Sequence, residues 1–174
     1  MLDAAGRDLW ASGRTDPTGV LLGGDGQPIE GEFMWQGGCT PKTAAQQRFQ
    51  PHYETITRQD QVQIYQELVA APPKNATEKS CGPHATAQGP LTTSFLSICA
   101  KVKDNRILPQ GFLKLEDRIA ISRRLGADDK MAKEAGADGV EGDSDYERGG
   151  SDSLIYRVPL AEIAGRPAAV QATL

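Results

Sequence analysis

At 174 residues the chain is long enough for one domain, residues 1–174, with a buried core. Nineteen glycines, eleven prolines and a mean hydropathy of −0.45 indicate many turns and long loops. The net charge of −4 argues against general nucleic-acid binding, which needs a basic face, and no apolar run approaches the roughly 20 residues that span a bilayer.

The N-terminal segment predicts a turn at residues 3–6 followed by a strand at residues 7–12. Only two residues precede this turn, so the first strand of the hairpin is missing. Residues 168–174 stop in the middle of an alternating pattern. We therefore expect a β-domain that is truncated at both termini.

Two tight turns follow, at residues 15–19 and 23–26, on either side of a short apolar strand at residues 20–22. Asp16 and Asp25 are calcium-ligand types, but neither loop has the alternating oxygen ligands and the final glutamate of an EF-hand. Ordinary turn chemistry is the better interpretation of both aspartates.

The middle of the chain alternates between loops and one expected strand. Residues 30–50 and 70–90 are predicted to be loops by composition. Between them, Val62 and Ile64 alternate with glutamines and favour a strand at residues 60–67. A helix is the alternative, because Val62, Tyr65 and Val69 also have helical spacing.

The pattern of residues 91–102 predicts a half-buried strand that enters a fixed corner. Pro109 and Gly111 suit positions i+1 and i+3 of a type I turn. Three apolar residues are expected to anchor this corner in the core: Ile107, Leu108 and Phe112.

Beyond the corner, residues 114–124 and 128–135 predict two short helices. Residues 152–160 alternate as a strand, which we expect to pair with residues 168–174. The elements together predict an all-β fold, an antiparallel β-sandwich with long loops and one or two short helices.

Three cysteines, Cys39, Cys81 and Cys99, are too few for a disulfide framework. Cys39 and Cys81 lie in loops and could bridge in an oxidising compartment, or both could be free thiols. Cys99 alternates with the apolar face, so we expect it to pack at the sheet.

Few residues could carry chemistry. The chain has two histidines, His52 and His84. Cys81 and His84, completed by Cys39 and His52, could hold a zinc ion, although ordinary loop residues are the more common reading of such a set. There is no Cys-x-x-Cys-His run for covalent haem and no nucleotide-binding or nucleophile-elbow motif.

The acidic run at residues 138–152 is the better candidate metal site. Carboxylates on a glycine-rich loop can wrap calcium, and we single out Asp143, Asp145 and Asp152. The alternative is a solvated acidic loop.

Six pieces of sequence together resemble the C-terminal, haem-free β-domain of bacterial multihaem c-type cytochromes. They are Asp3-Ala-Ala-Gly-Arg7, Trp10-Ala-Ser-Gly-Arg14, Pro51-His-Tyr-Glu54, Asp60-Gln-Val-Gln-Ile-Tyr65, Lys103-Asp-Asn-Arg106 and Leu108-Pro-Gln-Gly-Phe112. The chain departs from this pattern in its acidic insert and its three cysteines.

The resemblance implies a β-sandwich in the periplasm or at the cell surface, beside a haem-bearing segment or cytochrome subunit. On that reading the chain is a non-catalytic accessory domain of an electron-transfer protein. Haem c belongs to the parent protein, and His52 could approach a neighbouring haem as a ligand or edge contact. The alternative is a secreted β-sandwich module that binds calcium or another ligand. An enzyme is the least favoured reading.

Overall fold

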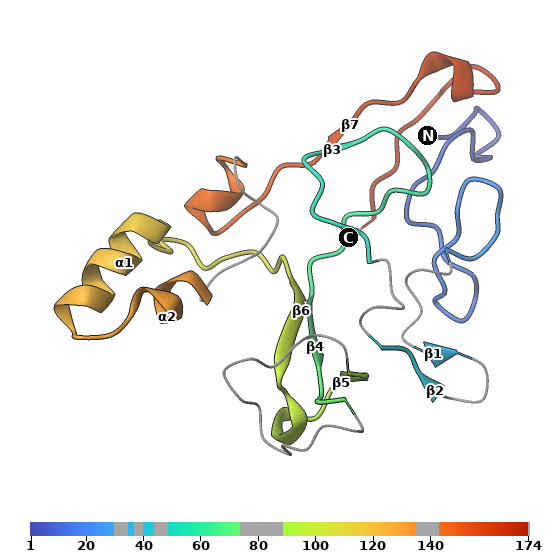
Figure 1. The fold of residues 1–174 in the computed structure, drawn as a ribbon. Coiled ribbons are helices and arrows are strands. Elements are labelled where there is room, and N and C mark those ends of the chain that lie inside the picture. Colours follow the sequence, from blue (N-terminus) through green and yellow to red (C-terminus); the bar gives the residue numbers. More distant parts are fainter. Residues whose placement is uncertain (30–34, 37–39, 44–48, 74–88, 135–142, 174) are drawn as a thin grey trace.

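In the computed structural model, the chain is mostly non-helical and its strands form small sheets linked by loops (Figure 1). The structure describes residues 1–29, 35–36, 40–43, 49–73, 89–134 and 143–173. The strands are β1 (Trp35–Gln36), β2 (Thr40–Pro41), β3 (Thr55–Ile56), β4 (Glu67–Ala70), β5 (Leu91–Thr92), β6 (Ala100–Asp104) and β7 (Ile155–Tyr156). The helices are α1 (Leu115–Arg124) and α2 (Asp129–Glu134), with short 3₁₀ turns η4 (Phe95–Ser97), η5 (Tyr146–Arg148) and η6 (Leu160–Glu162).

The largest sheet is antiparallel and has the order β5-β4-β6. The prediction of one strand over residues 91–102 is wrong, because η4 separates β5 from β6. Local hydrogen bonds explain the break: the Ser94 amide donates to Thr92 Oγ1 at 3.1 Å and the Ser97 amide to the Ser94 carbonyl at 3.0 Å. Such bonds compete with the ladder of a sheet.

The strand at the C-terminal end has a different partner from the one expected. β7 pairs in parallel with β3, with Thr55 opposite Ile155, so the sheets are not all antiparallel. Residues 168–169 instead meet Leu2, whose amide donates to the Ala169 carbonyl at 2.9 Å. The predicted pairing of residues 152–160 with 168–174 is therefore wrong.

Three other predicted strands are also absent from the described chain. Residues 7–12 contribute only the isolated bridge between Leu2 and Asp8, and residues 20–22 only the isolated bridges of Leu21 and Leu22. Residues 60–66 are not a strand, and β4 begins only at Glu67. Side chains hold this stretch instead, because Gln61 Oε1 accepts the amides of Thr57 and Arg58 at 2.8 and 3.0 Å.

The turn interpretation of the two early aspartates is confirmed. Asp16 Oδ1 accepts the Thr18 and Val20 amides at 2.8 and 3.0 Å, and Asp25 Oδ1 accepts the Gln27 amide at 3.0 Å. These carboxylates stabilise their own turns.

The corner after β6 exists, but it differs from the prediction. The Phe112 amide donates to the Pro109 carbonyl at 3.0 Å, which places Pro109 at position i, and Gly111 at i+2 has a φ of +80°. Ile107 is 44% exposed, so it does not anchor the corner, while Leu108 and Phe112 are half-buried. The buried residue is Asn105, whose Oδ1 accepts the Gln66 amide at 3.0 Å.

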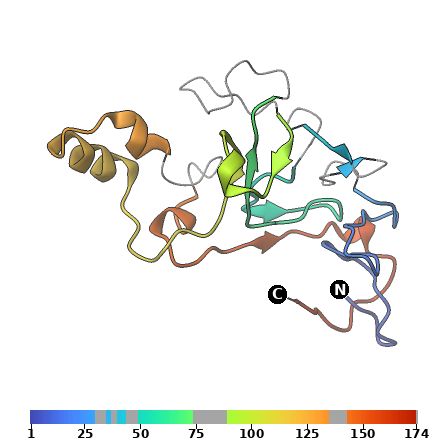
Figure 2. The same ribbon diagram turned by 90° about the horizontal axis from the view of Figure 1, so that it is seen from below.

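Both predicted helices are confirmed. α1 has acidic residues in its first turn and Arg123 and Arg124 in its last, which suits the helix dipole. The two helices pack on one another to one side of the sheets (Figures 1 and 2), and α1 has no buried residue. No helix in the described ranges is long and apolar enough to cross a membrane.

The buried interior is small and mixed in polarity. Its apolar members are Trp10, Ile56, Ala70, Leu91, Ala132 and Tyr146. Gln50, Asp104, Asn105 and Asp143 are buried with them. Because buried polar groups need partners, the positions of these side chains are determined largely by hydrogen bonds.

Candidate functional site

A buried polar cluster forms where residues 50–54 and 63–65 meet a segment distant in the sequence, residues 143–153. Its centre is His52, which lies 91 residues before Asp143 in the chain. We call His52, Asp143 and Asp152 the His–Asp–Asp cluster.

The three side chains of this cluster are close together and shielded from solvent. His52 Nε2 lies 3.0 Å from Asp143 Oδ2 and 3.9 Å from Asp152 Oδ2. The exposed fractions of the side chains are 3%, 6% and 1% for His52, Asp143 and Asp152. One ligand-type atom from each lies within 4.8 Å of the others.

Gln63 determines which nitrogen of His52 carries the proton. The Tyr53 backbone amide can only donate, and it lies 2.6 Å from Gln63 Oε1. The amide group of Gln63 therefore points its NH₂ at His52 Nδ1, 2.9 Å away. Nδ1 must accept this bond, so His52 is neutral, with its proton on Nε2 directed at Asp143.

Both carboxylates are also held from the other side. Asp143 Oδ1 accepts the Tyr146 amide at 3.2 Å. Asp152 Oδ1 accepts the Ser153 amide at 2.8 Å, and its Oδ2 accepts the Tyr65 hydroxyl. Burial, and then this bond to Asp152, raise the pKa of Tyr65 well above its usual range.

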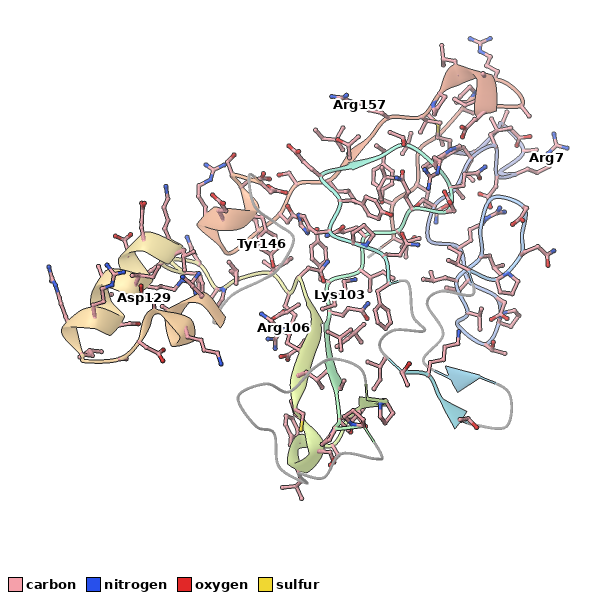
Figure 3. The ribbon with its side chains drawn as sticks, viewed as in Figure 1. Arg7, Lys103, Arg106, Asp129, Tyr146 and Arg157 are labelled. Carbon is pink, nitrogen blue, oxygen red and sulfur yellow. The ribbon has the colours of Figure 1, made fainter. Side chains whose placement is uncertain are left out.

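Tyr146 connects the cluster to the corner that follows β6. Its ring packs edge-on against His52, with centroids 4.8 Å apart, and its hydroxyl donates to the Arg106 carbonyl (labelled in Figure 3). Burial, with the Asp104 carboxylate as the next cause, raises the pKa of Tyr146 to about 12. Next to it, the Gly150 amide donates to the Leu108 carbonyl at 2.6 Å.

The structure brings together two of the three aspartates predicted as calcium ligands, and it adds His52. Asp145 lies beside the cluster and is half-buried. Hydrogen bonding, first to Ser153 and then to Asp143, lowers the pKa of Asp145. His52, predicted as a haem contact, uses Nδ1 and Nε2 in bonds to Gln63 and Asp143.

Sequence reasoning missed Gln63, Tyr65 and Tyr146 as members of the site. Gln63 and Tyr65 lie two residues apart, so they would share one face of the strand that the sequence predicted. Tyr146 lies within the acidic run, where a large aromatic side chain is a sign of burial. No local pattern connects either signal to His52.

Cys99 is disulfide-bonded, which the sequence did not predict. It lies immediately before β6 and not within a strand, although its amide donates to the Ala70 carbonyl of β4 at 2.9 Å. The Cys39–Cys81 bridge considered from the sequence involves two residues outside the described ranges. Cys39, Cys81 and His84 lie outside the described residues, and so does the zinc site considered for them.

The cluster offers one imidazole nitrogen and two carboxylate oxygens, a ligand set for a divalent cation. No protein-family model, curated protein or solved structure matches this chain.

Proposed function

We propose that this chain is a non-catalytic accessory domain of an exported electron-transfer protein of the multihaem cytochrome type. In this role it packs beside a haem-bearing segment and binds no haem covalently. The single observation that carries the proposal is how the residues of the resemblance are used: they hold the domain together.

Each piece of the resemblance forms part of the scaffold. Asp3 closes its own turn by accepting the Ala5 and Arg7 amides at 2.8 and 2.9 Å. The second piece supplies buried Trp10, and the third and fourth supply His52, Gln63 and Tyr65. The fifth and sixth form the corner that bonds to Gln66, Tyr146 and Gly150. This use supports a shared fold over a shared reaction.

The disulfide at Cys99 supports the exported setting, because such bonds persist in oxidising compartments. The two-sheet β-sandwich implied by the resemblance is part of the same proposal. In it, the β5-β4-β6 sheet and the β3–β7 pair would belong to its two layers.

The proposal also limits the role of His52. To bind haem iron, His52 would have to break its hydrogen bonds to Gln63 and Asp143 and become exposed. A haem that contacts the outer face of the cluster would need no such rearrangement. Tyr65, 38% exposed and adjacent to His52, provides that face.

The test is to isolate the native protein that carries this sequence, using antibodies against the chain, and to stain it for covalent haem. We expect c-type haem in the same polypeptide or in a tightly bound subunit. Native protein without haem, from cells that make c-type cytochromes, would contradict the accessory role.

A second candidate is a secreted module that binds a cation or another ligand itself. One observation favours it, the convergence of Asp143 and Asp152 on His52. A haem-free native protein whose melting temperature depends on a divalent cation would favour this candidate over the first.

A further inference from the structure

We propose that the His–Asp–Asp cluster is a binding site for a first-row divalent transition metal of the zinc class, bound by His52 Nε2 and one oxygen each of Asp143 and Asp152, with water as the fourth ligand. The inference holds for either candidate function. It differs from the calcium site predicted from the acidic run, because its ligands include an imidazole and leave out Asp145.

The spacing of the ligand atoms suits zinc. Two ligands at about 2.0–2.1 Å from a tetrahedral zinc ion lie about 3.4 Å from each other. The separations from His52 Nε2 are 3.0 Å to Asp143 and 3.9 Å to Asp152, on either side of that value. A metal between these atoms would need only small side-chain movements.

The charge of the cluster also favours a cation. His52 is held neutral, so two buried carboxylates face one another across it. Within the described chain, no lysine or arginine lies at ion-pair distance from Asp143 or Asp152; His52 is their partner. Buried carboxylates without a cation are costly, and a divalent ion would neutralise both.

The surrounding groups orient the two carboxylates in the way that metal sites require. Tyr65 and the Ser153 amide hold Asp152, and the Tyr146 amide holds Asp143. Hydrogen bonds of this kind fix the orientation of metal ligands in metalloproteins. An imidazole nitrogen selects zinc-class ions over calcium, which prefers oxygen ligands alone.

Metal binding has one defined structural consequence. Zinc on Nε2 replaces the proton there, and the neutral ring then carries its proton on Nδ1. The Gln63 amide must turn its carbonyl toward Nδ1, which places its NH₂ against the Tyr53 amide. A glutamate at position 63 would accept both donors at once, so Gln63→Glu should bind zinc more tightly than the wild type.

The experiment uses the full chain, stripped with chelator and kept non-reduced so that the Cys99 disulfide stays intact. Zn²⁺ binding is measured by calorimetry and thermal melts, with Ca²⁺ as the comparison. We expect one zinc per chain and a melting temperature higher by roughly 5–10 °C at a hundredfold excess over Kd, with no response to Ca²⁺. X-ray absorption at the zinc edge should show nitrogen and oxygen ligands.

Variants identify the ligands. We expect Asp152→Asn and His52→Gln to weaken zinc binding by more than about 100-fold. Gln63→Glu should strengthen it about tenfold, a usual effect for a residue that is hydrogen-bonded to a metal ligand. Asp25→Asn, at a turn carboxylate outside the cluster, is the matched control and should leave the zinc affinity unchanged.

Three results would overturn the site: no saturable zinc binding by the folded wild type, unchanged affinity in Asp152→Asn, or sulfur ligands at the zinc edge. Weaker or unchanged affinity in Gln63→Glu would overturn His52 Nε2 as a ligand. If His52→Gln does not fold, the edge spectrum of the wild type and the Gln63→Glu affinity still decide the question. Haem staining of the native protein is independent of all these readouts.

Discussion

At the scale of single residues, donors and acceptors determine the state of the buried centre. A backbone amide fixes the orientation of Gln63, and Gln63 fixes the tautomer of His52. His52, Asp143 and Asp152 could each be singled out from the sequence by residue type. Their meeting could not, since it depends on contacts between residues 91 positions apart.

Tyr146→Phe tests the connection between the cluster and the corner after β6. The change removes the hydroxyl that donates to the Arg106 carbonyl, so we expect the free energy of unfolding to fall by about 1–3 kcal/mol. Denaturant unfolding measures the change. Tyr156→Phe is the control, because Tyr156 is 53% exposed, and it should have almost no effect. Equal losses in both variants would contradict the role of the Tyr146 hydroxyl.

The same hydroxyl predicts a dependence on alkaline pH. The pKa of Tyr146 rises from 10.0 to about 12 on folding, so its contribution to stability is complete below pH 10 and is lost as the pH rises toward 12. Unfolding free energies measured across this range should fall more steeply for the wild type than for Tyr146→Phe. Parallel curves would be inconsistent with a buried Tyr146.

At the scale of elements, the sequence predicted the two helices but not which strands pair with each other. The helices at residues 114–124 and 128–135 were predicted because helical spacing and terminal charges act within a few residues. The strand expected at residues 91–102 failed because Thr92 and Ser94 bond locally. The parallel partner of β7 could not be predicted, since period-2 alternation is the same for every partner.

Gly149→Ala tests the close crossing between the corner and the segment after η5. Gly149 has a φ of +69°, and a Cβ there would lie 2.3 Å from the Pro109 carbonyl oxygen. Backbone strain and the overlap with this oxygen together should lower the free energy of unfolding by about 2–5 kcal/mol. Gly19→Ala is the matched control, because Gly19 has a φ of +88° and a Cβ there would meet nothing within 4 Å. Backbone strain alone should lower the free energy of unfolding by about 1–2 kcal/mol. Equal effects in denaturant unfolding would argue against the crossing.

Arg118 holds the α1–α2 pair to the chain that leads into it. Its guanidinium donates to the Leu113 and Ala132 carbonyls at 3.0 and 2.6 Å and lies 4.9 Å from the centre of the Phe112 ring. We expect Arg118→Ala to lower the free energy of local opening of the two helices by about 1–2 kcal/mol, and so to speed amide exchange in both. Arg124→Lys, at an exposed position of the same helix, keeps the positive charge of the last turn and should leave exchange unchanged. Protection that persists in Arg118→Ala would contradict this role.

At the scale of the whole molecule, small sheets and a mixed interior leave much of the stability to hydrogen bonds and to the disulfide. Composition predicted the early aspartate turns correctly. Residues 30–50 were predicted to be a loop, but they contain β1 and β2. The alternating strands suggested larger sheets than β1 to β7 form in the described chain. Pairing and covalent links are properties of the folded chain, which explains why the sequence pattern alone did not determine them.

Cys99→Ser tests the covalent link. Removing the disulfide raises the conformational entropy of the unfolded chain. We therefore expect the free energy of unfolding to fall by about 2–4 kcal/mol, with a lower melting temperature under non-reducing conditions. Reduction of the wild type should give a similar loss and should not affect Cys99→Ser further. A non-reduced peptide map that shows a free Cys99 thiol would contradict the bond.

The central claim is that three segments of the chain close around a buried His52 whose proton lies on Nε2. Nitrogen–proton NMR of the metal-free chain, with labelled histidine, tests it most directly. We expect a protected Nε2–H and an unprotonated Nδ1 for His52, with both changed in Gln63→Glu. A proton on Nδ1, or an Nε2–H that exchanges freely with solvent, would contradict this claim.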